Sequence, residues 1–129
     1  MPGAPLIENS IALLSTTTAV DMKTAQKNTL YTVPTGKTAY VTSVVIRETS
    51  ASLAGGTDYD LGTGANADTW RQTNDLSTMT TAGTDYMEIR GAANTKYTDN
   101  AAASVFGIKV ITGSTAAATA TIDVFGFLA

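Results

Sequence analysis

The chain of 129 residues contains no cysteine and no histidine. Without cysteine it can form no disulfide and has no thiolate to act as a nucleophile or as a zinc or iron–sulfur ligand. Without histidine it lacks the commonest general base, the usual transition-metal ligand and the Ser-His-Asp triad. We therefore predict that the protein is not an enzyme and uses no cofactor.

The chain has few charged residues, and acidic residues slightly outnumber basic ones. Charged residues make up 15% of the chain, and 8 Lys and Arg against 11 Asp and Glu give a net charge of −3. Nucleic-acid binding needs clustered cations, which are missing, so no nucleic-acid partner is expected. The opening residues MPGAPLIENS do not resemble a signal peptide, and no apolar run approaches the roughly 20 residues of a membrane span. We expect a soluble protein with no membrane partner.

The residues that are abundant favour β-structure. The chain has 24 Thr and 20 Ala, and 43% of its residues are hydrophobic. Short apolar segments recur between clusters of Gly, Asn, Thr and Pro, which predicts one all-β domain over residues 10–129, a β-sandwich or jelly roll of eight strands. The candidate strands are 10–18, 29–33, 38–49, 56–61, 67–72, 84–90, 103–112 and 118–128. A short helix or turn is conceivable only at 19–28.

Alternation within these strands predicts which residues face the core. The final strand places Ile122, Val124 and Leu128 on one face, with Thr121, Asp123, Phe125 and Phe127 on the other. Segment 38–49 has apolar residues on both faces, which is typical of a central strand. Its period of two would group Tyr40, Val44 and Ile46 against Val41, Val45 and Arg47.

Residues 1–9 differ from the rest of the chain. Pro2, Gly3 and Pro5 precede the apolar pair Leu6-Ile7. Because proline fixes φ and cannot donate a ladder hydrogen bond, this segment is predicted to be an extended arm rather than a strand.

Three patterns suggest chemistry but have simpler explanations. Gly36-Lys37-Thr38 resembles the end of a phosphate-binding loop, but it lacks the earlier glycine and a following helix, so a hairpin turn is favoured. Oxygen-bearing residues alternate from Asp58 to Asp68, as calcium ligands do, yet a solvated strand face explains the spacing better. The carboxylate pairs Asp85/Glu88 and Glu48/Asp58 could serve a glycosidase, but nothing indicates an apolar cleft around them.

Four residues are candidates for an interface. Trp70 is the only tryptophan and precedes Arg71, and both residue types are enriched at interface hot spots, although a buried tryptophan is the favoured interpretation. Phe125 and Phe127 lie opposite the predicted core face of the last strand. They would need a further layer, either another subunit or the chain's own arm or a loop.

Residues 30–89 resemble small virion proteins of tailed bacteriophages. The resemblance rests on Tyr31-Thr32-Val33-Pro34-Thr35-Gly36-Lys37-Thr38-Ala39, on Ala54-Gly55-Gly56-Thr57-Asp58-Tyr59-Asp60 and on Trp70-Arg71. It implies a β-sandwich or jelly-roll domain in a capsid decoration (cementing) protein, or in a head fibre or tail. Decoration proteins of this type sit as trimers on the outside of the head, so the implied partners are the major capsid protein or other virion proteins, and the implied location is the virion, assembled in the host cytoplasm.

On this hypothesis the arm provides the link between subunits. Nine extended residues span roughly 30 Å, so Pro2, Pro5, Leu6 and Ile7 could lie across a neighbour. Trp70, Arg71, Phe125 and Phe127 complete the set of predicted partner-binding residues.

The alternative is a receptor- or carbohydrate-binding β-sandwich in a fibre or tail. Sugar sites combine exposed aromatic rings with polar side chains. Tyr59, Trp70, Tyr86 and Tyr97 are the candidate rings for such a site.

Overall fold

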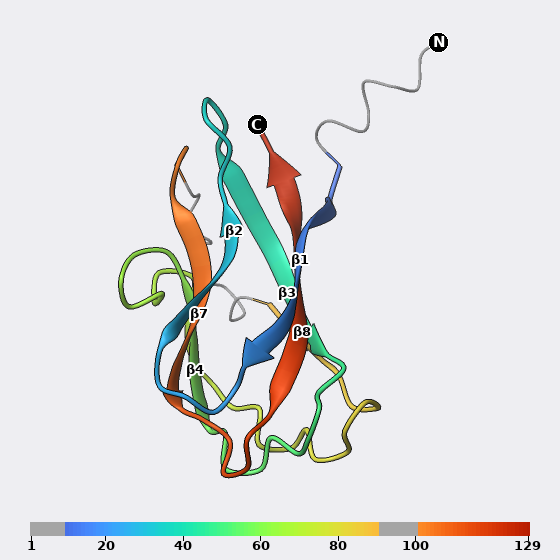
Figure 1. Cartoon of the computed structure of the whole chain (residues 1–129). Coiled ribbons are helices and arrows are strands. Elements are labelled where there is room, and N and C mark those ends of the chain that lie inside the picture. Colours follow the sequence, from blue (N-terminus) through green and yellow to red (C-terminus); the bar gives the residue numbers. More distant parts are fainter. Residues whose placement is uncertain (1–9, 91–100) are drawn as a thin grey trace.

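A computed structural model of the chain describes residues 10–90 and 101–129. The described residues form two four-stranded antiparallel sheets that face each other (Figure 1). Sheet A has the strand order β1-β8-β3-β6 and sheet B has the order β2-β7-β4-β5. The strands are β1 (Ala12–Asp21), β2 (Lys27–Thr32), β3 (Ala39–Arg47), β4 (Asp58–Gly62), β5 (Arg71–Asn74), β6 (Met87–Ile89), β7 (Val105–Thr112) and β8 (Thr119–Leu128). The predicted all-β sandwich is therefore confirmed.

The strands pair in a nested order. The first strand pairs with the last, the second with the seventh, the third with the sixth and the fourth with the fifth. The chain also passes from one sheet to the other at most of its connections. This nesting is consistent with the narrower jelly-roll prediction.

The core lies between the two sheets and is built from alternate residues of their strands. Burial removes apolar surface from water, and this is the main force that holds such sheets together. The inward side chains that are at most 1% exposed include Val41, Val44, Ile46, Tyr59, Leu61, Phe106, Ile108, Val110, Ile122 and Val124. In β8 the predicted core-facing residues Ile122 and Val124 are buried, whereas Leu128, at the end of the strand, is only partly buried.

Each of the eight predicted strands has a counterpart, with shifted ends. Segment 19–28 is not helical: β1 continues to Asp21 and a bend leads directly into β2. The fifth strand begins at Arg71 rather than at residue 67. Ala67 adopts a positive φ of 48°, which no regular strand accommodates, so Trp70 belongs to the preceding loop.

The predicted faces of β3 are wrong because the strand contains a β-bulge. Its register with β8 shifts between Val41 and Ser43, which inserts one extra residue. As a result Val41, Val44 and Ile46 are buried together, while Tyr40, Val45 and Arg47 are only partly buried. The prediction that β3 is central is correct, since it lies between β8 and β6.

The turn at residues 33–37 forms, but it is not a hairpin. The amide of Lys37 donates to the carbonyl of Pro34 over 3.1 Å, and Gly36 has a φ of 77°, as a type II turn requires. The strands that it joins, β2 and β3, lie in opposite sheets. The predicted arm, residues 1–9, lies outside the described residues, so the division into an arm and a domain stays a prediction.

Candidate interaction surface

The outward surface of sheet A, called face A below, is rich in apolar side chains. In β8 the side chains of Phe125 and Phe127 point away from the core, as the alternation predicts, and both are partly buried. Tyr40 pairs with Phe127 across the strands, and their rings stack with centroids 4.8 Å apart and an interplanar angle of 11°. Ile11 and Leu13, beside them, are 63% and 53% exposed. Face A therefore presents large apolar groups where a solvated sheet would carry polar ones.

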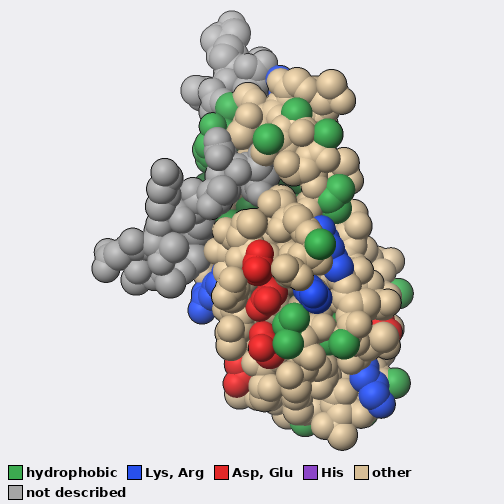
Figure 2. Space-filling model, turned by 90° about the vertical axis from the view of Figure 1, so that its left-hand side faces the viewer, with side chains coloured by type: hydrophobic (Ala, Val, Ile, Leu, Met, Phe, Trp, Pro, Cys, Tyr) green, Lys and Arg blue, Asp and Glu red, His purple; other side chains and the backbone are tan. Residues whose placement is uncertain are grey.

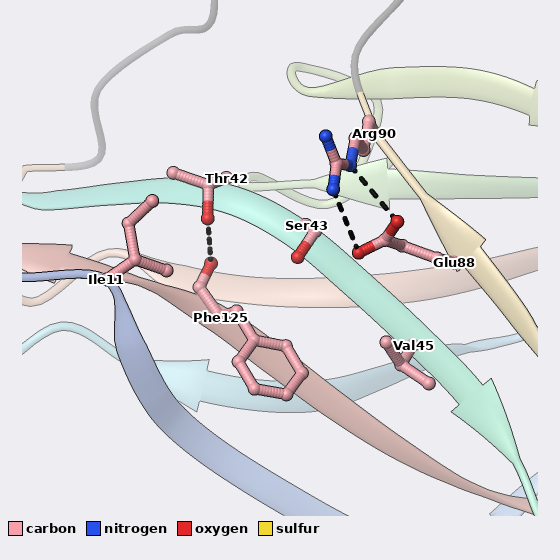
Figure 3. Close-up of a pocket in the computed structure, with 7 residues that line it drawn as sticks. All are labelled: Ile11, Thr42, Ser43, Val45, Glu88, Arg90 and Phe125. Carbon is pink, nitrogen blue, oxygen red and sulfur yellow. Dashed lines mark hydrogen bonds and ion pairs between the residues drawn. The ribbon is translucent and has the colours of Figure 1, made fainter.

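A groove of about 430 Å³ crosses face A (Figure 3). It is lined by Ile11, Thr42, Ser43, Val45, Glu88, Arg90 and Phe125. Figure 3 shows the Phe125 ring beside β3, with Ile11 at one end of the groove and the Glu88–Arg90 ion pair at the other. An apolar floor with a few polar groups is typical of a binding groove.

Two bulges help to shape this groove. The extra residues Leu14 of β1 and Thr42 of β3 both lie at the level of Phe125, on either side of β8. Bulges bend a strand and redirect its side chains. At the bulge in β3, the Thr42 hydroxyl donates to the carbonyl of Phe125 over 3.2 Å. The groove is thus a product of irregular pairing around a regular β8.

Beside the Glu88–Arg90 pair, face A carries a second ion pair, between Arg47 and Asp123. Asp123 is 7% exposed and accepts from Arg47 Nε over 2.7 Å and from the Thr16 hydroxyl over 2.8 Å. The hydrogen bond from Arg47 holds the pKa of Asp123 below its usual value, against the opposing effect of burial, and the Thr16 bond assists it. This carboxylate is fully engaged within the chain.

The outward surface of sheet B, called face B, is polar and in contact with the chain's own loop. The ammonium groups of Lys27 and Lys109 donate to the Gly64 carbonyl over 2.6 Å and to the Asn66 side chain over 3.0 Å. These bonds fix the 63–70 loop to the sheet. Figure 2 shows the side of the molecule that carries sheet B, with acidic and basic side chains gathered near its middle.

The suggested calcium pattern does not assemble. Asp60 accepts the Thr73 amide over 2.8 Å, and the side chain of Asn66 is held by Lys109. Burial and the neighbouring Asp60 raise the pKa of Asp58. Within residues 10–90 and 101–129, no three potential metal-ligating side chains of the His, Cys, Asp and Glu types lie together.

Trp70 and Arg71 are adjacent in sequence but have different environments. Trp70 is 6% exposed, its indole N–H donates to the Val41 carbonyl over 3.2 Å, and its ring packs edge-on against Phe106. It takes the buried position that the sequence favoured. Arg71 is exposed on β5 and donates to the carbonyl of Arg90, at the end of the groove on face A. Trp70 therefore does not join Phe125 and Phe127 at the surface.

The aromatic residues proposed for sugar binding are not gathered either. Tyr59 is 0% exposed, its hydroxyl donates to the Met22 carbonyl over 2.8 Å, and burial raises its pKa to about 12. Tyr86 is 72% exposed on the loop before β6. Tyr97 lies outside the described residues. Tyr59 and Trp70 are in the core and Tyr86 is on a loop, so the described members of this set form no shared platform for a sugar ring.

The paired carboxylates have separate partners. Asp85 accepts the Thr81 amide over 2.9 Å within its loop, and Glu88 pairs with Arg90 over 3.1 Å. Glu48 lies 3.4 Å from Arg47.

Among the residues that line the groove, the sequence predicts only Phe125 as a partner-binding residue, and Glu88 is considered only as half of a carboxylate pair. The others lie on β3, on β6, just before β1 and just after β6, and their proximity depends on strand order and on the bulges. The apolar residues Ile11, just before β1, and Leu13, within it, are visible in the sequence, but only the pairing of Leu13 with Phe125 places them beside the groove. In the described part of the chain, no helix is long and apolar enough to cross a membrane.

No protein-family model and no curated protein matches this chain. Among solved structures, it is similar to a chain of the acidic stable capsid structure of Helicobacter pylori bacteriophage KHP30. The TM-score is 0.50, the sequence identity is 10%, and the similarity covers 92% of each chain. At this identity the likeness concerns the fold, and it extends over nearly the whole of both chains.

Proposed function

We propose that the protein is a structural component of a bacteriophage virion, and more narrowly a decoration protein that binds the outside of the head. The observation that carries the proposal is the likeness of the fold, over 92% of both chains, to a chain of a phage capsid structure. The resemblance of residues 30–89 to small virion proteins of tailed phages supports it from the sequence.

The two faces of the sandwich suit a protein that is bound on one side and solvated on the other. Face A offers exposed apolar side chains and a groove, which association would remove from water. Face B carries charged side chains that bond to the chain's own loop. Face A is therefore the surface that we assign to contacts with other chains of the virion.

The test is the number of copies per particle. Quantitative mass spectrometry of gradient-purified particles from the source gives the ratio of this chain to the major capsid subunit. A ratio near one, or another fixed fraction set by the symmetry of the shell, supports decoration. A handful of copies per particle would move the role to a fibre or tail, and absence from particles would overturn the virion proposal.

A binding assay then tests face A. Val45 is partly buried in the groove, whereas Ile111 is 43% exposed on β7 of sheet B. A Val45→Lys variant should bind stripped particles at least about tenfold more weakly than the wild type, while Ile111→Lys should bind normally. Equal loss in both variants, or loss only in Ile111→Lys, would contradict the assignment of face A.

A further inference from the structure

The groove on face A lies beside the point where the undescribed first nine residues join the fold. Ile11 lines the groove and precedes β1, and the described chain begins one residue earlier, at Ser10. The groove is apolar at Ile11, Val45 and Phe125. Leu6 and Ile7, the largest apolar side chains of the first nine residues besides Met1, are close enough in sequence to lie near such a surface.

The chemistry of residues 5–7 fits this groove. Pro5 has a fixed φ and no N–H, so it favours an extended segment that does not add a regular strand. Extended proline-containing segments dock in grooves lined by aromatic rings, where little entropy remains to be lost. The groove supplies the Phe125 ring, and the Thr42 and Ser43 hydroxyls lie beside it. Leu6 and Ile7 can fill the apolar part while a carbonyl group of the same segment accepts from the Ser43 hydroxyl, since the Thr42 hydroxyl already donates to Phe125.

The direction of β1 argues that the segment comes from another molecule. Ala12 pairs with Gly126, whereas Thr16 and Val45 both pair with Asp123, further along β8. From Thr16 back to Ala12 the chain therefore runs away from the level of Val45. To enter its own groove, the chain would have to reverse its direction within the three residues between Ile7 and Ile11. A second copy meets no such constraint.

We propose that face A is a contact between copies of this chain, in which residues Pro5, Leu6 and Ile7 of one copy occupy the groove of the next. This inference goes beyond the proposed function, because it concerns the purified protein and requires no capsid. Contacts of this kind run from head to tail, so they generate a closed ring where the rotation permits it.

Disulfide trapping tests the proposal directly, because the chain has no cysteine of its own. Two single variants, Ile7→Cys and Val45→Cys, are purified separately, mixed and oxidised, and the products are identified by intact mass. We expect a covalent heterodimer in at least about tenfold excess over the product of a matched mixture of Ile7→Cys with Ile111→Cys. Ile111 is exposed on sheet B and provides the control.

Two outcomes would overturn the proposal. Equal heterodimer formation in both mixtures would mean that the trapping is non-specific. The double variant Ile7→Cys/Val45→Cys distinguishes the second outcome. If it forms a disulfide only within one chain, and the mixed single variants form none, the segment occupies its own groove and the proposed contact between copies is contradicted.

Light scattering provides a second measurement that does not depend on the cysteines. The full-length wild type should be oligomeric, and a Leu6→Asp/Ile7→Asp variant should dissociate at a concentration at least about tenfold higher than the wild type does. Its melting temperature as a diluted monomer should match the wild type, because on this proposal both side chains contact another copy and not their own domain. A wild-type protein that is monomeric at every concentration tested would also overturn the proposal.

Discussion

Face A and face B are the outward surfaces of two sheets with the same number of strands, but they are completed in opposite ways. On face B, Lys27 and Lys109 bond to the chain's own 63–70 loop. On face A, the Arg47–Asp123 pair satisfies the polar part, while Phe125, Ile11 and Val45 surround an open groove. The outward surface of sheet B is therefore partly covered by a loop of the same chain, whereas sheet A leaves apolar surface for a partner.

The difference originates in how the strands connect. Between β4 and β5 the chain makes a loop of eight residues, 63–70, that buries Ala67 and Trp70 and reaches the lysines of face B. Among residues 10–90 and 101–129 no such loop covers β8, and the bulges of β1 and β3 redirect side chains there. Loop length shapes one face, and bulges shape the other.

The largest effect should come from the glycine beneath the groove. A Cβ added to Gly126 would lie 2.2 Å from the Tyr40 carbonyl oxygen, whereas at Gly107 of sheet B the nearest atom is the Asn28 carbonyl oxygen at 2.6 Å. We predict that Gly126→Ala lowers the free energy of unfolding by about 3 kcal/mol, because rigid backbone must move apart. Gly107→Ala should cost about 1–2 kcal/mol, since part of its contact is with the flexible Lys27 side chain. Urea denaturation measures both, and an equal or larger loss in Gly107→Ala would contradict the prediction.

Next in size is the carboxylate of face A. The pKa of Asp123 is lower in the folded than in the unfolded chain, so its contribution to stability is full above the unfolded pKa of about 3.9 and declines as the pH falls below it. We predict that Asp123→Asn destabilises the protein by about 2 kcal/mol at pH 7. The difference in stability between Asp123→Asn and the wild type should become smaller below about pH 4. Melting curves between pH 2 and pH 7 test this, and a gap that stays constant with pH would disprove it.

The carboxylate of Asp58, on face B, should give stability a pH dependence of the opposite sign. The pKa of Asp58 is raised by burial and by Asp60, so its ionised form opposes folding above that pKa. One of its oxygens is buried without a hydrogen-bond partner. We predict that Asp58→Asn raises the stability at pH 7 by less than about 1 kcal/mol, and that this gain disappears at low pH. Destabilisation at pH 7 would show that the Asp58 charge is compensated.

The strands of this fold could be predicted from the sequence because their signals are local. Alternation and turn residues lie within ten positions of each other, and β8, which is regular, has the predicted faces. The faces of β3 could not be predicted in the same way, because the bulge at Thr42 exists only through pairing with β8, 83 residues away. The groove could not be predicted from the sequence for the same reason. It brings together Ile11, which precedes β1, Val45 of β3 and Phe125 of β8.

The smallest effect concerns the bonds that complete face B. Lys27→Met keeps the apolar stem but removes the ammonium group that donates to Gly64, so the 63–70 loop should open locally more often while the sheets stay folded. We expect faster amide hydrogen exchange in that loop, a loss of global stability below about 1 kcal/mol, and unchanged exchange in β8 beneath face A. Lys37→Met, in the β2–β3 turn, is the control and should leave the loop unaffected. Faster amide exchange in β8, or an unchanged rate in the 63–70 loop, would mean that the two faces are not stabilised independently of each other.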